Sequence, residues 1–276
     1  TRPDIADVAD EWRNKLYAFL FDDRDKKVRV TDGKSRITKH DTYHEKMLKT
    51  AEYHETKGDL TTDECEWVKK ELNYFKTKFD TIVKAGETEM KRQVSNYNRR
   101  AKRTTAKGKD EFKALMVDLY EKFAQSDSGG KTMSHYFFGV MNIKTCPYCN
   151  RQFTFTLDEK EAKAAPEYDH FYDKSDYPLL AVSFYNLVPS CHVCNHVKGK
   201  KKTVKVNPFF RGFESKFYLY DKKDKTKRLN ALEILSQGDG NLDLRYSDES
   251  KSSADKGNIK AFGLKGLYAM HDDYVK

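Results

Sequence analysis

The chain has 276 residues, of which 34% are Asp, Glu, Lys or Arg and 13% are aromatic, and its formal net charge is +9. The aromatic content excludes a disordered chain, no apolar run approaches the roughly 20 residues that span a bilayer, and the charged first thirty residues are unlike a signal peptide. We therefore expect a soluble, cytoplasmic protein with no membrane partner, whose positive charge favours a polyanionic partner.

The first 130 residues show the periodicity of helices. Thr61 and Glu64 have the spacing of a capping box at a helix start, and Gly86 has the position of a helix stop. Apolar side chains then recur at helical spacing between them: Trp67, Leu72, Phe75, Phe79, Ile82 and Val83. Similar patterns predict helices in 4–21 and 110–124. We expect a helical region over residues 1–130.

The segment 91–109 carries eight basic side chains and no acidic one. A solvated helix face followed by a loop is one interpretation of this charge. The other is a phosphate-contacting arm in which Tyr97 stacks on a base. The nucleic-acid-binding candidates of such an arm are Arg99, Arg100, Lys102 and Arg103.

The segment 125–134 is rich in Ser and Gly, which is typical of a linker and predicts a domain boundary near residue 130. The next domain is expected over 131–210, and a mixed accessory region without a recognisable motif over 211–276. Within 131–210, the segment 151–157 alternates Phe and Leu with polar residues, which predicts a half-buried strand. The segment 168–172 is expected to be the returning strand.

Two Cys-x-x-Cys pairs lie in 131–210: Cys146 with Cys149, and Cys191 with Cys194. Four thiolates form a tetrahedral set that suits structural Zn²⁺. A redox Cys-x-x-Cys is the alternative, but no thioredoxin-like βαβ pattern accompanies the pairs. An odd number of cysteines in a reducing compartment argues against disulfides. The fifth, Cys65, lies in a helical pattern and is expected to be a buried, inert thiol.

Zinc binding does not explain several polar residues around the two pairs: Asp169, His170, Asn186, Asn195 and Lys198. The chain order is Cys-x-x-Cys, Asp-His, Asn, and Cys-x-x-Cys-Asn-x-x-Lys. In this order the segment 146–200 resembles the zinc-containing HNH endonucleases. The resemblance implies an α+β fold, in which a zinc-stapled ββα-metal core carries a mainly helical N-terminal region and a small mixed C-terminal extension.

The resemblance also implies metal-dependent hydrolysis of DNA phosphodiester bonds, with RNA left open. His170 would be the general base, and Asn186 would accept a hydrogen bond from its ring or pin the loop. Asp169 and Asn195 would hold one Mg²⁺ or Mn²⁺ ion. Phosphate contacts would come from Lys198, Lys200 and Lys201.

Two local requirements follow from this assignment. Asp169 and His170 are adjacent and would face opposite sides of a regular strand, so a bend or a strand end is needed there. Asn195, rather than His196, should face the strands, because it is three residues before Lys198 on the same helix face. His192 is expected to be exposed or hydrogen-bonded to the zinc thiolates.

Two other functions stay open, a non-catalytic zinc-stapled nucleic-acid-binding module and a partner-binding scaffold. His170 discriminates among them, because zinc geometry does not need it and hydrolysis does. The resemblance further implies roles in restriction, homing or anti-phage defence, in some cases with an ATPase partner. A homo-oligomer would allow one active site per subunit to cut both strands.

Overall fold

The computed structural model describes residues 4–22, 27–31, 34–38, 41–158, 163–199, 204–212, 216–236, 242–247 and 252–270. The chain forms two compact units. Unit 1 comprises Thr1–Asn142, Thr156–Ala165 and His170–Leu187, and unit 2 comprises Ile143–Phe155, Pro166–Asp169 and Val188–Lys276. Neither unit is a continuous stretch of chain. The division into domains at residues 130 and 210 stays a prediction.

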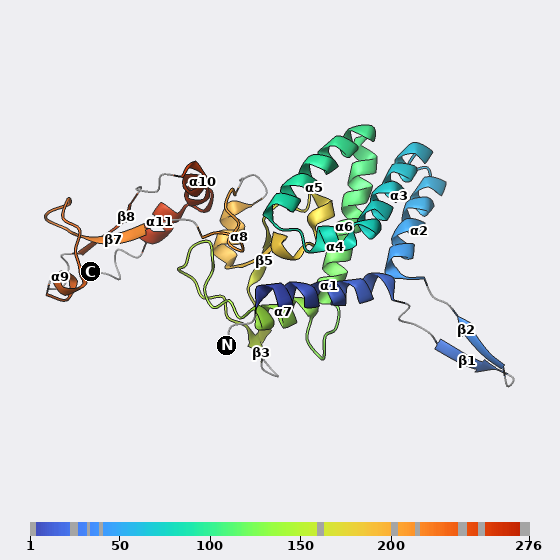
Figure 1. Ribbon diagram of the computed structural model, residues 1–276, viewed down its shortest axis with the longest axis horizontal. Coiled ribbons are helices and arrows are strands. Elements are labelled where there is room, and N and C mark those ends of the chain that lie inside the picture. The colour runs from blue at the N-terminus through green and yellow to red at the C-terminus, as the bar shows by residue number, and fades with distance from the viewer. Residues whose placement is uncertain are drawn as a thin grey trace. The chain divides into compact units, whose positions relative to one another are not determined.

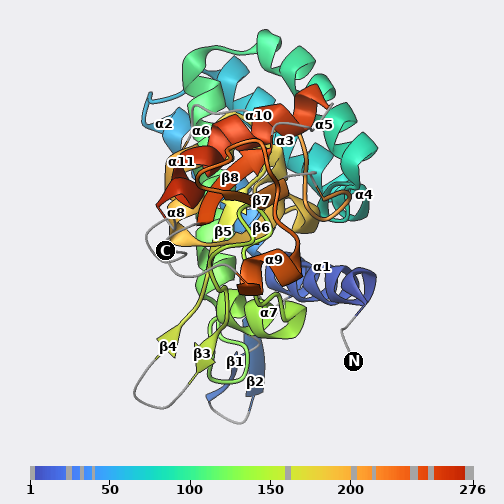
Figure 2. The same cartoon turned by 90° about the vertical axis from the view of Figure 1, so that its left-hand side faces the viewer.

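Unit 1 is mainly helical (Figure 1). Its helices are α1 (Ile5–Phe21), α2 (Tyr43–Thr56), α3 (Thr62–Thr77), α4 (Phe79–Val83), α5 (Glu87–Arg100), α6 (Ala106–Gln125) and α7 (Met133–Met141). Short 3-10 turns are η1 (Ala101–Arg103), η2 (Pro178–Leu180) and η3 (Phe184–Asn186). Two antiparallel hairpins pair β1 (Lys27–Thr31) with β2 (Lys34–Thr38) and β3 (Leu157–Asp158) with β4 (Lys163–Ala164) (Figure 2).

The three predicted helices are confirmed, although the second is divided into α3 and α4 at Lys78. The capping box at the start of α3 is present. Glu64 donates its backbone N–H to Oγ1 of Thr61 at 3.3 Å, and its carboxylate accepts the N–H of Thr61 at 2.8 Å. These contacts satisfy backbone donors that have no partner within the helix, which is why α3 begins there. All six side chains of the predicted apolar stripe are buried.

Trp12 lies at the centre of the unit 1 core and is 1% exposed. Its ring packs at centroid distances of 4.9 Å against Phe123 and Phe137, and 6.2 Å from Phe184. Its indole N–H donates to the carbonyl of Val182 at 2.9 Å. The core therefore fixes the 178–186 segment against the helices, and this segment contains Asn186 and contacts His170.

The basic stretch forms the second half of α5, the turn η1 and the start of α6. Tyr97, in this stretch, is 5% exposed and its ring lies 6.1 Å from that of Phe112. Burial raises the pKa of the Tyr97 hydroxyl above its ordinary value. The prediction that Tyr97 stacks on a base is wrong, because α6 already covers this ring.

Unit 2 contains the two cysteine pairs and the described C-terminal elements. A two-stranded sheet is formed by β5 (Glu167–His170) and β6 (Leu187–Ser190), whose residues His170 and Leu187 are assigned to unit 1. The other elements are α8 (His192–Lys198), β7 (Lys216–Asp221), α9 (Ala231–Ser236), β8 (Leu242–Ser247), α10 (Ser253–Phe262) and α11 (Leu264–Ala269). Strands β7 and β8 are antiparallel, and α10 packs beside α8.

The strand predicted over 151–157 is not formed. Within this segment Phe153 makes an isolated bridge with Thr145, and β3 begins at Leu157. Phe153 and Phe155 are 74% and 59% exposed, so the alternation does not mark a buried face. Strand β5 overlaps the segment 168–172 expected to return, but it begins one residue earlier, ends two residues earlier and pairs with β6.

No helix in the described residues combines the length and the apolar composition that crossing a membrane requires.

Candidate functional site

The four cysteines of the two Cys-x-x-Cys pairs converge within unit 2. Their Sγ atoms all lie within 4.8 Å of one another, and all four residues are buried. In the first pair, the carbonyl of Cys146 accepts the N–H of Asn150 at 2.7 Å, which closes a tight turn. In the second pair, Cys191 is the N-cap of α8, and its Sγ accepts the N–H of Cys194 at 3.4 Å.

The chemistry of this cluster fits a structural Zn²⁺ ion. Four thiolates at such short distances repel one another unless a cation neutralises them, and a tetrahedral set of four sulfurs is a usual structural zinc site. Cys65 is 1% exposed, and burial raises its pKa to about 11, as expected of an inert thiol.

The C-terminal helices pack against the first cysteine pair. The ring of Tyr148, between the two cysteines, stacks on Phe262 of α10 at a centroid distance of 4.2 Å. The hydroxyl of Tyr268 in α11 donates to the carbonyl of Cys149 at 2.6 Å. The sequence assigned no role to this region, but these contacts make it part of the support of the cluster.

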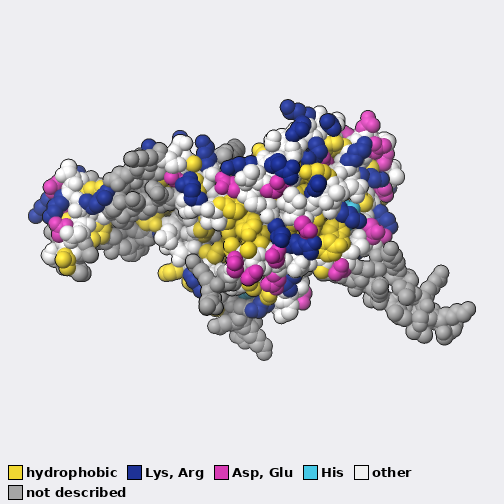
Figure 3. Space-filling model, in the orientation of Figure 1, with side chains coloured by type: hydrophobic (Ala, Val, Ile, Leu, Met, Phe, Trp, Pro, Cys, Tyr) yellow, Lys and Arg dark blue, Asp and Glu magenta, His cyan; other side chains and the backbone are white. Residues whose placement is uncertain are grey.

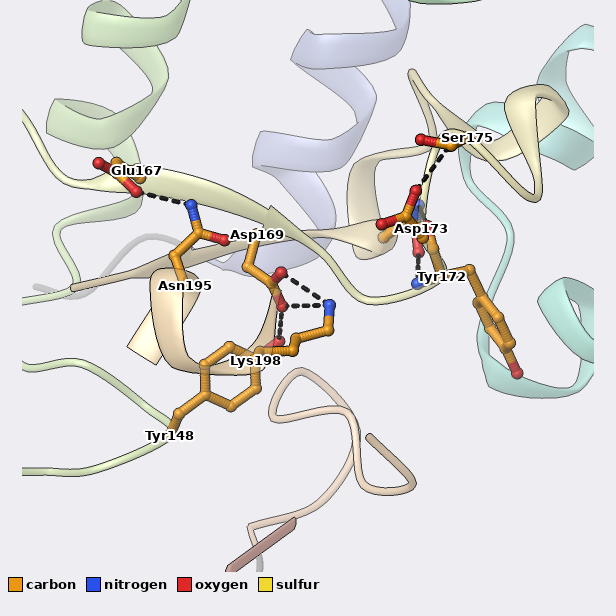
Figure 4. Close-up of polar contacts among 9 residues, drawn as sticks. Tyr148, Glu167, Asp169, Tyr172, Asp173, Ser175, Asn195 and Lys198 are labelled. Carbon is orange, nitrogen blue, oxygen red and sulfur yellow. Dashed lines mark hydrogen bonds and ion pairs between the residues drawn. The ribbon is translucent and has the colours of Figure 1, made fainter. Parts of the chain in front are cut away.

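Asp169 is 4% exposed and is held by two side chains of unit 2 (Figure 4). The ammonium of Lys198 donates to its Oδ1 at 2.7 Å and to its Oδ2 at 2.8 Å. The hydroxyl of Tyr148 donates to Oδ2 at 2.7 Å. Lys198 is itself 5% exposed, and its ammonium is bound by Asp169. The phosphate contact predicted for Lys198 stays a prediction.

Asn195 lies one turn before Lys198 and contacts the same strand. Its Nδ2 donates to Oε2 of Glu167 at 2.6 Å, and Nδ1 of His192 donates to Oε1 of the same carboxylate at 2.7 Å. Although burial opposes ionisation, these hydrogen bonds hold the pKa of Glu167 below its ordinary value. The Oδ1 atom of Asn195 points toward Asp169 (Figure 4). As expected, Asn195 and Lys198 share the face of α8 toward β5, whereas His196 is exposed.

His170 is the last residue of β5, so the strand ends where the sequence required it to bend or stop. Its Nε2 lies 3.0 Å from the carbonyl of Ala181, and its ring lies 4.7 Å from that of Tyr120, edge to face. A carbonyl oxygen only accepts hydrogen bonds, so this contact favours a proton on Nε2. The sequence did not predict this contact, because its acceptor is a backbone carbonyl.

Asn186 is fully buried and pins the loop that follows β5. Its Oδ1 accepts the N–H of Tyr172 at 2.7 Å, and its Nδ2 donates to the carbonyls of Tyr172 and Leu180, both at 3.0 Å. The resemblance implied either a hydrogen bond from the His170 ring or pinning of the loop. The contacts that Asn186 makes here are those of the loop-pinning role.

Replacing Asn186 by Ala should therefore destabilise unit 1 by about 3 kcal/mol, because three backbone groups lose their hydrogen-bond partner. Urea unfolding followed by tryptophan fluorescence measures this, since Trp12 and Trp67 both lie in unit 1. Asn73→Ala, an exposed change in α3, is the control and should stay within about 0.5 kcal/mol of wild type. Equal stability of the two variants would contradict the pinning role.

The predicted phosphate-binding cations do not form one group. Arg100 makes a two-pronged ion pair with Glu71, at 2.6 and 2.9 Å. Arg99 donates to Asn96 at 2.8 Å. Lys102 and Arg103 are exposed on η1. Lys200 and Lys201 lie outside the described residues.

Comparison with known proteins finds one relevant similarity. Over 95 residues the chain is 42% identical to Septu protein PtuB from Bacillus thuringiensis. The match spans 33% of this chain and 35% of that protein, so the similarity is partial on both sides. No protein-family model matches the chain. No solved structure matches it either.

Proposed function

We propose that the chain is an anti-phage defence protein, similar to Septu protein PtuB, that cuts DNA by HNH nuclease chemistry. The observation that carries the proposal is the surroundings of Asp169. Beside the four-cysteine cluster, α8 directs Lys198 onto Asp169 and the Oδ1 atom of Asn195 toward it. The order β5, β6, α8 supports a ββα core.

His170, which follows Asp169 in the chain, is proposed as the general base. The Ala181 carbonyl fixes the ring through Nε2, and in this proposal the oriented imidazole takes a proton from the attacking water. Asn186 acts indirectly by closing the loop that carries Ala181, through its hydrogen bond to Leu180. These residues then orient the base without contacting the substrate.

Asp169 and Asn195 are proposed to hold one Mg²⁺ or Mn²⁺ ion. Both offer oxygen atoms, which hard divalent ions prefer. Among the described residues, Oδ1 of Asp169 accepts a hydrogen bond from Lys198, whereas Oδ2 accepts from both Lys198 and Tyr148, so Oδ1 is the oxygen proposed to face the cation. An ion held there would stabilise charge on the phosphate and on the leaving oxygen. Lys198 limits the repulsion between Asp169 and an incoming phosphate.

A protein partner, such as an ATPase, and a homo-oligomer belong to the same proposal. Both follow from the partial similarity to a Septu protein and from the family resemblance.

The test is cleavage of supercoiled plasmid by the purified chain with added Mg²⁺ or Mn²⁺. Wild type should nick or linearise the plasmid, and His170→Ala should be slower by about 10²-fold or more, since it removes the general base. The matched control is His54→Ala, which removes a histidine of α2 that pairs with Glu111 and should cut like wild type.

Equal cleavage by wild type and His170→Ala would reject His170 as the base. Absence of cleavage in every sample, with or without a partner, combined with retained DNA binding, would support the non-catalytic binding module instead. Absence of both activities would support the scaffold.

A further inference from the structure

A hollow of about 1,120 Å³ lies within unit 1, between the end of α5, the turn η1, the start of α6 and the 175–177 segment. Its cationic lining side chains are Lys102, Lys109 and Lys113. Figure 3 shows Lys and Arg side chains gathered over the end of the unit where α5 and α6 meet. We call this hollow the α5–α6 groove.

The size and lining of the groove suit an extended polar ligand. Small-molecule sites are usually about 300–1,000 Å³, mostly apolar and closed around their ligand. The α5–α6 groove is larger, and its walls carry ammonium, amide and hydroxyl groups, including those of Asn98, Ser175 and Tyr177. Lysine, asparagine, serine and tyrosine side chains are among those that contact nucleic-acid phosphates.

The lysines of the groove are available for an anion. The side chains of Lys102 and Lys109 are exposed, and neither forms an ion pair or hydrogen bond with another described residue. Lys113 pairs with Asp110 at 2.5 Å, and Asp176 is the other acidic lining residue. Two cations are thus left for external phosphates or carboxylates.

The remaining basic residues of the predicted arm face other groups. Arg100 is bound by Glu71, and Arg103 lines a separate hollow that contains Asp63, Glu66 and Glu71. The acidic residues there make it a poorer place for phosphate. The structure therefore moves the centre of the basic surface from the arginines to Lys102 and two lysines of α6.

We propose that the α5–α6 groove binds the sugar-phosphate backbone of DNA. The inference deepens the proposed function, on which it rests for its choice of DNA, and assigns Lys102 and Lys109 as backbone contacts. Such contacts are independent of sequence, so they position a substrate without selecting it. An acidic protein segment would need the same cations, and the experiment distinguishes the two.

The test is binding of a fluorescein-labelled DNA duplex by the full chain carrying His170→Ala, without added divalent metal, so that cleavage does not interfere. Anisotropy titrations over a series of salt concentrations give the affinity and its salt dependence. Lys102→Glu combined with Lys109→Glu should weaken binding on the order of tenfold and lower the slope of log K against log salt by about two.

The matched control is Lys46→Glu combined with Lys57→Glu, which changes the net charge equally. Lys46 and Lys57 are exposed residues of α2 and its C-cap, outside the groove. The control should keep most of the affinity and the slope, and thermal unfolding verifies that both double variants fold. Equal weakening by the two double variants would overturn the groove, because net charge alone would then explain binding.

Two further outcomes separate this inference from the nuclease proposal. Plasmid cleavage by wild type, together with unchanged DNA binding by the groove variant, would reject the groove alone. Weakened binding by the groove variant, together with no cleavage by wild type, would support the groove and reject the nuclease. Displacement of DNA from wild type by polyglutamate at equal charge concentration would overturn the choice of DNA and favour an acidic protein partner.

Discussion

Cys194→Ser is expected to release one zinc ion per chain and to unfold unit 2. Cys194 has no exposed surface and lies in the four-sulfur cluster. Structural zinc contributes about 10–16 kcal/mol to the folding of small zinc peptides, so its loss exceeds the stability of a typical domain. Metal analysis of the purified variant measures the zinc, and circular dichroism with heating measures the loss of the unit 2 transition.

The matched control is Cys65→Ala, which removes the fifth cysteine from unit 1. Because Cys65 is far along the chain from both pairs and belongs to the other unit, this variant should keep the full zinc content. Tryptophan fluorescence should report little change of unit 1 in Cys194→Ser, since both tryptophans lie in unit 1. A Cys194→Ser protein that keeps both its zinc and its unfolding temperature would refute the zinc assignment.

Lys198→Ala is expected to lower the free energy of unfolding of unit 2 by about 3–5 kcal/mol, because it leaves a buried carboxylate without its counter-ion. Both partners of the Asp169–Lys198 pair have side chains that are 5% exposed, so water cannot replace the lost ammonium. Urea unfolding followed by circular dichroism gives the size of the effect.

Two variants test this explanation. Lys174→Ala breaks an exposed ion pair with Glu121, in which the side chains are 29% and 61% exposed, and should cost less than about 1 kcal/mol. Lys198→Met combined with Asp169→Leu removes both charges and should recover most of the stability that Lys198→Ala loses. If the double variant is as unstable as Lys198→Ala, the unpaired charge is not the cause.

The features predicted correctly from the sequence are those that depend on neighbouring residues. The helix start at Thr61 needs only one turn of chain, and the cysteine pairs need only ligand chemistry and local spacing. The common face of Asn195 and Lys198 follows from helix geometry, and the contacts of both with β5 confirm it. Local rules were sufficient for these features.

The features that were missed or wrong depend on distant segments. Phe153 and Phe155 alternate with polar residues as in a strand, but their side chains are exposed and pack into no core. In the sequence, the basic neighbours of Tyr97 suggest an exposed ring. In the structure Phe112, from a distant segment, packs against this ring. His170 is held by the backbone carbonyl of Ala181. Every residue has such a carbonyl, so the identity of residue 181 does not indicate this contact. Side-chain patterns cannot reveal such a partner.

The interleaving of the two units sets an order for their assembly during synthesis. Trp12 donates to a carbonyl 170 residues later in the chain, and Tyr268 donates to a carbonyl 119 residues earlier. Neither unit can complete these contacts while the later segment is still inside the ribosome. In the nascent chain, Trp12 and the first cysteine pair therefore lack these contacts. Both contacts form only when translation is well advanced.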